Sequence, residues 1–338
     1  MNVWGRLHRT AKIALVLAAL ATGAVLATLV AGWGLGRSER AGAYRLVGAW
    51  PFASGQPFGI AVDPRNGNVL VTDAASARVV RFDADGGMLG QFGAEGDGAG
   101  QFMRPSGIAV AEDGSVYVAD YDLDRIQKFT EQGEHILHWA TSGGEGELRN
   151  PSGLAVDRAG RVYVADFLGS VVKVFDAEGR FAEALGTPGQ WRSGSLDYPT
   201  EVNVAPDGRV FIADAYNYRI QMFDAGRRSW RAMGWEALRL VPRPGSGAGG
   251  FDIPTGVAFD PQRGVIHVAD SANRRIVMLD SAGRFMAEWG IRERGPGFHT
   301  PQMVAVSPDG GRLYATDLDN SRVLVLAVEA DEPGESER

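Results

Sequence analysis

Three oxygen-bearing side chains, those of Asp166, Glu201 and Asn203, stand where repeated segments of the chain follow a different pattern. Glu201 and Asn203 replace a recurring glycine and a recurring alanine. Val171 replaces the arginine that follows equivalent aspartates, so we expect Asp166 to lack a partner in its loop and to face solvent or a ligand. Because carboxylate and amide oxygens are ligands of hard cations, these residues are candidates for binding a metal ion or an ammonium group. A water-filled polar channel is the alternative.

Aromatic residues form a second candidate set, in short loops that follow apolar strands. Tyr121 and Phe167 occupy two of these loops, and Tyr216 and Tyr218 flank Asn217 in a third. Exposed aromatic rings beside hydrogen-bonding groups are typical of binding surfaces. A Gly-rich insertion at residues 235–250 fits a partner-binding loop and neutral drift equally well. The full set of candidate ligand-binding residues is Tyr121, Asp166, Phe167, Thr200, Glu201, Asn203, Tyr216, Asn217, Tyr218 and Gln302.

Six segments of similar sequence must position these side chains. Each begins with proline and continues with small and apolar residues, at spacings of 48, 46, 48, 55 and 47 residues. Their sequences are Pro57-Phe-Gly-Ile-Ala-Val-Asp, Pro105-Ser-Gly-Ile-Ala-Val-Ala, Pro151-Ser-Gly-Leu-Ala-Val-Asp, Pro199-Thr-Glu-Val-Asn-Val-Ala, Pro254-Thr-Gly-Val-Ala-Phe-Asp and Pro301-Gln-Met-Val-Ala-Val-Ser. A repeat of this length indicates one supersecondary unit that is used six times.

Each repeat predicts four antiparallel strands. The proline segment and a second apolar strand flank a glycine turn, such as Asp113-Gly114, whose positive φ suits a hairpin. The second strand ends in aspartate, and in five repeats an arginine follows five residues later. We expect this pair to fix the loop between the second and third strands, and the recurring alanine to pack at the crowded centre. A third strand and another glycine turn lead to a fourth strand, so each unit is a propeller blade.

The sixth repeat ends after its third strand. The segment Tyr44-Arg-Leu-Val-Gly-Ala-Trp50 reads like a fourth strand and belongs to no earlier repeat. We expect this N-terminal strand to complete the last blade, which would leave no open edge in the ring. The sequence therefore predicts an all-β, six-bladed propeller over residues 44–328.

The pattern resembles NHL repeats, whose signature combines a Pro-x-Gly strand, the sequence Val-Tyr-Val-Ala-Asp and an Asn-x-Arg turn. Asp270-Ser-Ala-Asn-Arg-Arg-Ile276 carries the turn, and the resemblance covers about residues 44–328. It implies an NHL-type propeller, and extracytoplasmic bacterial members of this family are thought to present one face to a partner. Other relatives include a zinc-dependent lyase, and similar six-bladed propellers include metal-dependent lactonases.

The N-terminal region carries 24 residues without a charge between Lys12 and Arg37, which is long enough to span a bilayer. A signal peptide cleaved after Ala27 is the alternative. We expect residues 1–12 to be cytoplasmic, 13–35 to form a transmembrane anchor, 36–43 a linker and 329–338 an acidic disordered tail. The propeller then lies on the periplasmic or extracellular side of the cell membrane, attached by a single pass.

Charge and residue usage exclude several function classes. The whole chain has a net charge of −7, and its first 40 residues contribute +4, so residues 41–338 carry a net charge of −11. A charge of this sign argues against nucleic-acid binding. The chain has no cysteine, so any metal must use oxygen or histidine ligands. His267 occupies a position that is aromatic in four other repeats, and only His299 is placed to approach the axial face.

Two hypotheses follow. The first is a membrane-anchored, non-catalytic binding or scaffold module that recognises a protein, peptide or glycan on the face formed by the aromatic loops, without a cofactor. The second is a metal-dependent lyase or lactonase-like hydrolase with a divalent cation held by oxygen ligands at the channel mouth. The histidines do not cluster as the zinc-dependent reaction requires, whereas an oxygen-ligand site at Glu201 and Asn203 fits the lactonase-like alternative.

Overall fold

The computed structural model describes residues 44–52, 55–140, 143–190, 192–224, 226, 228–233, 244–290 and 298–328. The expected transmembrane anchor, the linker and the acidic tail lie outside these residues. Within the described ranges, no helix has the length and apolar character needed to cross a membrane.

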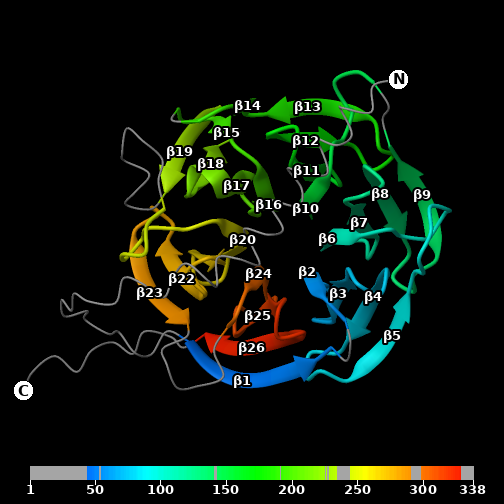
Figure 1. Cartoon of the computed structure of the whole chain (residues 1–338), viewed down its shortest axis with the longest axis horizontal. Helices are drawn as coiled ribbons and strands as arrows, with labels where there is room; N and C mark the ends of the chain where they lie inside the picture. The colour runs from blue at the N-terminus through cyan, green and yellow to red at the C-terminus, as the bar shows by residue number, and fades with distance from the viewer. Residues whose placement is uncertain are drawn as a thin grey trace, which may run out of the picture. The chain divides into compact units, whose positions relative to one another are not determined.

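Six four-stranded antiparallel sheets stand around one axis as the blades of a propeller (Figure 1). In each blade the first strand lies nearest the axis and the fourth lies at the rim. This arrangement confirms the predicted six-bladed, all-β fold.

The strand bounds follow the repeats. Blades one to three comprise β2 (Pro57–Val62), β3 (Val69–Asp73), β4 (Arg78–Phe82) and β5 (Met88–Phe92); β6 (Pro105–Val110), β7 (Val116–Asp120), β8 (Arg125–Phe129) and β9 (His135–Trp139); and β10 (Pro151–Val156), β11 (Val162–Asp166), β12 (Val171–Phe175) and β13 (Phe181–Leu185). Blades four and five comprise β16 (Pro199–Val204), β17 (Arg209–Asp214), β18 (Arg219–Asp224) and β19 (Ser229–Met233); and β20 (Pro254–Asp260), β21 (Val265–Asp270), β22 (Arg275–Asp280) and β23 (Phe285–Gly290). Blade six comprises β24 (Pro301–Val306), β25 (Arg312–Asp317), β26 (Arg322–Val328) and β1 (Tyr44–Pro51). Outside the blades lie the two-stranded parallel pair β14 (Thr187–Pro188) and β15 (Ser195–Leu196) and the short 3₁₀ helix η2 (Ala215–Asn217).

Glycines close the hairpins between the first and second strands, as predicted. Their φ angles of 65° to 88° lie in the left-handed region, where only glycine meets no steric penalty from a Cβ. These residues are Gly67, Gly114, Gly160, Gly208, Gly264 and Gly310.

The N-terminal strand closes the ring. β1 pairs antiparallel with β26 from Tyr44 opposite Val328 to Pro51 opposite Arg322, with a bulge between Leu46 and Gly48. The first described strand and the last therefore share one sheet, which confirms the predicted closure and gives β26 a partner on both sides.

The hydrophobic core lies between the blades. Each of six clusters of buried residues combines side chains from two neighbouring blades. A large apolar residue three positions before the repeat proline belongs to five of these clusters, and so anchors the connection from one blade to the next. These residues are Phe102, Leu148, Leu196, Phe251 and Phe298, each at most 2% exposed.

The first strands approach one another so closely that glycine is required at most equivalent positions. A Cβ at Gly107 would lie 2.3 Å from the carbonyl oxygen of Ser152 in the next blade. A Cβ at Gly256 would lie 2.7 Å from the carbonyl oxygen of Gln302. Both distances are far inside van der Waals contact, so the innermost wall of the ring leaves little room for side chains there.

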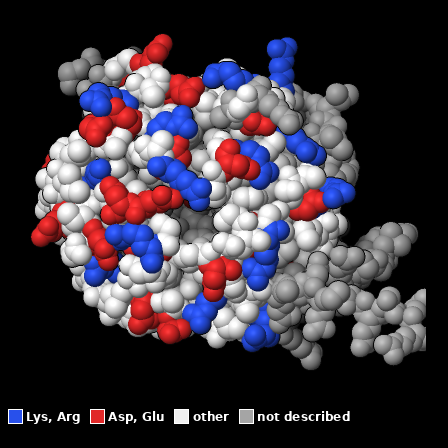
Figure 2. Space-filling model, turned by 180° about the vertical axis from the view of Figure 1, so that it is seen from behind, with Lys and Arg blue, Asp and Glu red and all other residues white. Residues whose placement is uncertain are grey.

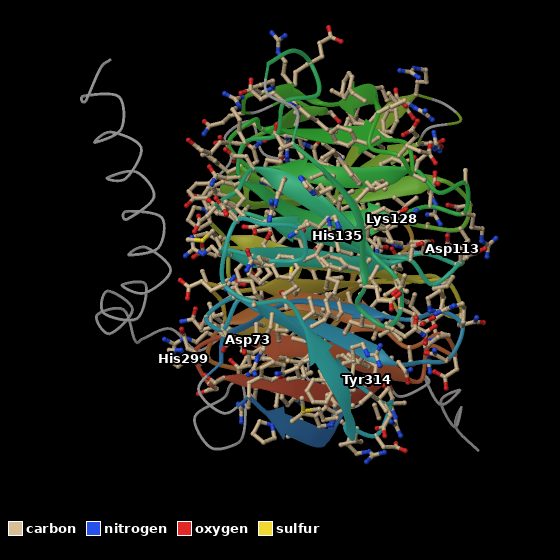
Figure 3. The ribbon with its side chains drawn as sticks, turned by 90° about the vertical axis from the view of Figure 1, so that its right-hand side faces the viewer. Asp73, Asp113, Lys128, His135, His299 and Tyr314 are labelled. Carbon is tan, nitrogen blue, oxygen red and sulfur yellow. The ribbon has the colours of Figure 1, made fainter. Side chains whose placement is uncertain are left out.

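The propeller has two distinct faces. The starts of the first strands and the ends of the second strands define what we call the upper face, and the glycine hairpins define the lower face. In Figure 3 the upper face is at the left, where Asp73 and His299 lie, and the lower face is at the right, where Asp113 lies.

Candidate functional site

The aspartate that ends each second strand joins three segments of its blade. In blade four, Asp214 accepts hydrogen bonds from the backbone N–H of Asp197 at 2.8 Å, from Arg219 at 2.9 Å and from the Asn217 amide at 2.9 Å. Arg219 in turn donates to the carbonyl oxygen of Ser195. The Asp–Arg pair fixes the loop in blades one, four, five and six, as predicted. In blade two, Arg125 donates instead to backbone carbonyl oxygens of the preceding connection. Asn217, which is 2% exposed, is part of the buried network of blade four.

The expectation for Asp166 in blade three is wrong. Asp166 is fully buried, and the ammonium group of Lys173 lies 3.0 Å from its carboxylate as an ion pair. Lys173 also donates to the carbonyl oxygen of Glu147, so one lysine replaces the arginine that Val171 displaced. Burial raises the pKa of Asp166, and the charge of Lys173 opposes that shift. The carboxylate is thus occupied by its own blade.

Four aromatic rings form a continuous arc on the upper face, across blades two, three and four. The ring centroids of Tyr121 and Phe167 are 6.0 Å apart, those of Phe167 and Tyr198 are 5.0 Å apart, and those of Tyr198 and Tyr216 are 5.1 Å apart. The guanidinium of Arg104 lies 5.4 Å from the Tyr121 ring. We call Tyr121, Phe167, Tyr198 and Tyr216 the aromatic arc.

The members of the aromatic arc differ in exposure. Phe167 is only 6% exposed, so the expectation that its ring is exposed is wrong. Its ring lies between those of Tyr121 and Tyr198 and supports them from below the surface, while the three tyrosines remain partly exposed. Burial raises the pKa of Tyr121 to about 12 and also raises that of Tyr216. These hydroxyls therefore stay neutral at physiological pH and can donate hydrogen bonds.

Three further candidates are Tyr218, which follows the arc residue Tyr216 by two positions, and Thr200 and Gln302, each of which directly follows a repeat proline. Tyr218 is partly exposed, and its backbone is left-handed with φ of 55°. The Thr200 hydroxyl donates to the carbonyl oxygens of Ala213 and Pro254, so it bridges two blades. Gln302 is 2% exposed, and its Nε2 is among the buried atoms without a hydrogen-bond partner in the described residues.

Glu201 lies in β16, the strand of blade four that faces the axis. It occupies the position that is glycine in four blades and Met303 in blade six. Its Oε1 accepts the backbone N–H of Val202 at 3.0 Å, and the carboxyl group lies beside Gly153 of blade three. Burial raises the pKa of Glu201 well above its ordinary value, and the Val202 hydrogen bond only partly opposes this.

The three oxygen-bearing candidates do not converge. The Asn203 carbonyl accepts the backbone N–H of Phe259 at 3.1 Å and so faces blade five, whereas Asp166 is committed to Lys173. No group of three or more His, Cys, Asp or Glu side chains arranged to hold a metal occurs within the described ranges. Of the three, Glu201 alone keeps a carboxyl group that its blade does not neutralise.

His299 forms a hydrogen-bonded pair at the upper face. Its Nδ1 lies 2.8 Å from the carboxylate of Asp319, and the Thr300 hydroxyl donates to the same oxygen. Both members of the pair are more than 40% exposed. An imidazole oriented in this way has its Nε2 directed elsewhere, which is the arrangement that a general base uses.

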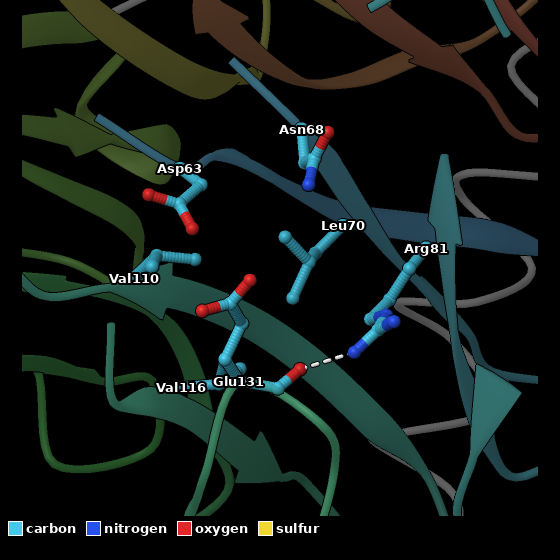
Figure 4. Close-up of a pocket in the computed structure, with 7 residues that line it drawn as sticks. All are labelled: Asp63, Asn68, Leu70, Arg81, Val110, Val116 and Glu131. Carbon is cyan, nitrogen blue, oxygen red and sulfur yellow. Dashed lines mark hydrogen bonds between the residues drawn. The ribbon is translucent and has the colours of Figure 1, made fainter. Parts of the chain in front are cut away.

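Side chains of the lower face join neighbouring blades of the ring. Figure 2 shows charges of both signs interspersed around a central hollow on this side. Arg65 joins blades one and two by contacting Asp63 at 2.7 Å and Glu131 at 2.8 Å. A cleft between these blades has room for about one water molecule (Figure 4). Its walls are Asp63, Asn68, Leu70, Arg81, Val110, Val116 and Glu131.

Sequence reasoning missed Tyr198 and Arg104, both of which contribute to the upper face. Each precedes the repeat proline by one residue, where the other repeats carry Gln56, Asn150 or Ile253 among others. Because all six repeats carry different residues at this position, a comparison of the repeats gives no signal there.

The model of the NHL repeat matches residues 102–129 and 148–175, which span the first three strands of blades two and three with the connections before them. The other blades repeat the same strands and the same aspartate network. The chain therefore carries NHL repeats and folds as a six-bladed β-propeller.

The NHL-repeat propeller is similar to several solved structures. A catalytically inactive virginiamycin B lyase from Staphylococcus aureus with quinupristin matches with a TM-score of 0.57 and 15% identity, over 87% of this chain and 91% of that one. A streptogramin B lyase matches with a TM-score of 0.58 and 11% identity, over 85% and 98%. Kuenenia stuttgartiensis hydrazine synthase matches with a TM-score of 0.55 and 16% identity, over 88% and 99%. At these identities the similarity shows the fold alone.

Proposed function

We propose that the NHL-repeat propeller is a binding or scaffold module that recognises a protein, peptide or glycan through the aromatic arc. The observation that supports this most directly is the unbroken contact of four rings across three blades. Such a surface offers broad, rigid rings and neutral hydroxyl donors, the chemistry that recognition surfaces favour. The buried Phe167 holds the rings in place before a ligand arrives, which lowers the entropy lost on binding.

The arc can be tested with the full-length chain in a mild detergent on arrays of peptides and glycans. The arc variant carries Tyr198→Ser and Tyr216→Ser, and the control variant carries Arg158→Ser in an exposed ion pair of the lower face. We expect ligands of the wild type to be kept by the control and weakened by the arc variant at least about tenfold, as for hot-spot aromatics. Equal binding by the arc variant, or no ligand for the wild type, would contradict the proposal.

The proposed location is the outer side of the cell membrane, with residues 13–35 as the anchor. The absence of native cysteine makes this measurable, because a single Asp122→Cys substitution supplies the one thiol in the chain. Asp122 is exposed on the upper face. A membrane-impermeant maleimide should label this variant in intact cells. Labelling that requires cell lysis would place the propeller inside.

A second candidate function is an enzyme of the lyase or lactonase type with a divalent cation at the channel mouth. The pair of His299 and Asp319 favours it, because an imidazole at the upper face that is oriented by a carboxylate can accept a proton from a substrate. The test is incubation with quinupristin, the compound in the similar lyase structure, and with simple lactones, in the presence of Mg²⁺, followed by mass spectrometry. Opened product that disappears in His299→Ala would support the enzyme.

A further inference from the structure

Glu201 stands where the geometry of the ring calls for glycine. At Gly59, Gly107 and Gly256 a Cβ would collide with the backbone of the next blade. In blade six the equivalent Met303 is 1% exposed and fills its space with apolar atoms. Glu201 instead brings an ionisable group to this innermost ring. Its side chain fits because Gly153 lacks a Cβ, which would lie 2.4 Å from Oε1.

The carboxyl group has one open acceptor. Oε1 receives the N–H of Val202, and in the described part of the chain no cation and no further donor contacts the group. Oε2 is absent from the buried atoms that lack a partner, so it retains contact with solvent. β16 is the strand of its blade nearest the axis (Figure 1), and the ring has a hollow at its centre (Figure 2), so we take the solvent beside Oε2 to be that of the central hollow. The ionised form of a carboxyl enclosed in this way is disfavoured, so the group takes up a proton more readily unless a cation pairs with it.

We propose that Glu201 is the receptor for a primary ammonium group, such as a lysine side chain, that a ligand inserts into the channel from the upper face. This inference rests on the proposed binding role of the aromatic arc. Tyr198, a member of the arc, is three residues before Glu201 and immediately before β16. A ligand that lies across the arc would therefore reach Glu201 with a flexible side chain of several carbons.

The donor set selects an ammonium over other cations. Calcium and magnesium need six or more oxygen ligands, and Glu201 supplies one open oxygen. A guanidinium pairs best with both oxygens of a carboxylate, but Oε1 is already engaged by Val202. An ammonium is a compact charge that pairs with a single oxygen and is attracted to the faces of aromatic rings such as Tyr198.

The test uses Nα-acetyl-lysine methylamide as the probe and its neutral isostere Nα-acetyl-norleucine methylamide, with the full-length chain in detergent. Saturation-transfer NMR measures binding of each to the wild type, to Glu201→Gln and to the matched control Glu178→Gln, an exposed glutamate of the lower face. We expect the lysine probe to bind the wild type and the control, and Glu201→Gln to weaken it about tenfold, the loss of one charge-assisted hydrogen bond.

Several outcomes would overturn the inference. They are equal binding of the lysine and norleucine probes, unchanged binding by Glu201→Gln at an unchanged melting temperature, and displacement of the lysine probe by millimolar Ca²⁺, which would mark a metal site. The proposed function is decided separately by the arc variant on the arrays. Loss of array binding in the arc variant together with no lysine effect at Glu201 would keep the binding module and remove only the ammonium receptor.

Discussion

The hydroxyl of Tyr44 lies 2.6 Å from Nδ1 of His267, so the closing strand of blade six is hydrogen-bonded into the core of blade five. Both side chains are buried, and their ring centroids are 5.7 Å apart. His267 occupies a position that holds Tyr117, Tyr163 or Tyr314 in other blades. The buried Nε2 of His267 has no hydrogen-bond partner among the described residues. The closing strand is thus held by its backbone ladder with β26 and by a buried polar contact with blade five.

This contact should make stability depend on pH. Burial lowers the pKa of His267 to about 3, below its ordinary value of 6.5. Between these values the unfolded chain binds a proton that the folded chain excludes, so the free energy of unfolding falls as the pH falls from about 6.5 towards 3. Each unit of pKa difference corresponds to about 1.4 kcal/mol, so the loss approaches roughly 4 kcal/mol. Urea unfolding of the wild type and His267→Gln across this range measures it. The variant should lose less stability, and parallel curves would show that His267 does not contribute.

The closing strand should determine whether the ring holds together. Deleting residues 44–51 removes the partner of β26 and exposes its backbone edge and Leu324. We expect a large drop in melting temperature by circular dichroism, partly restored by a synthetic peptide of residues 44–51. An equally long deletion of residues 331–338 is the control. If both deletions leave the melting temperature unchanged, the closing role of β1 is wrong.

Lys173 should be essential to blade three. Lys173→Met leaves the fully buried carboxylate of Asp166 without its counter-charge, which we expect to destabilise the fold by about 3–5 kcal/mol. The double variant Lys173→Gln with Val171→Arg recreates the arrangement of Arg219 and Gln221 in blade four. Chemical denaturation should show that it recovers most of the loss. A destabilised double variant would mean that blade three has adapted to lysine in other ways.

The close approach of the inner strands predicts a contrast between two glycines. Gly107→Ala forces a methyl group against the Ser152 carbonyl and should lower the free energy of unfolding by about 1–3 kcal/mol. Gly48→Ala in β1 meets nothing closer than Val325 at 3.8 Å and should change it by less than about 0.5 kcal/mol. Thermal unfolding of the two variants gives the comparison. Similar values for both would argue against a tightly packed axis.

The fold could be predicted from sequence because each of its constraints recurs six times. Hairpin glycines, the terminal aspartate and the proline start appear in register, so one ambiguous strand is settled by its siblings. The closing strand was predictable as well, since a six-bladed ring left residues 44–50 with one vacant edge, at β26. The repeat spacing and the closure of the ring both concern the backbone, and both can be recognised in the amino-acid sequence.

The candidate site was less predictable because it depends on where side chains turn. The replacement of arginine by Val171 was visible, but its compensation by Lys173 requires knowing that a residue two positions along β12 reaches the same carboxylate. The burial of Phe167 depends on rings contributed by two neighbouring blades. Glu201, in contrast, was found because it replaces a glycine that recurs at the same position in four other blades.

The ribosome makes the two paired strands, β1 and β26, at very different times, because they lie at opposite ends of the propeller sequence. β1 is made early, and β26 follows only after all other blades. At about 5–20 residues per second, the interval between Tyr44 and Val328 is roughly 15–60 s. During that interval β1 presents an unpaired edge to anything nearby. A chain that stops before residue 322 lacks β26, so its β1 keeps an unpaired edge that can bind other strands. This exposed edge distinguishes an incomplete chain from the finished ring.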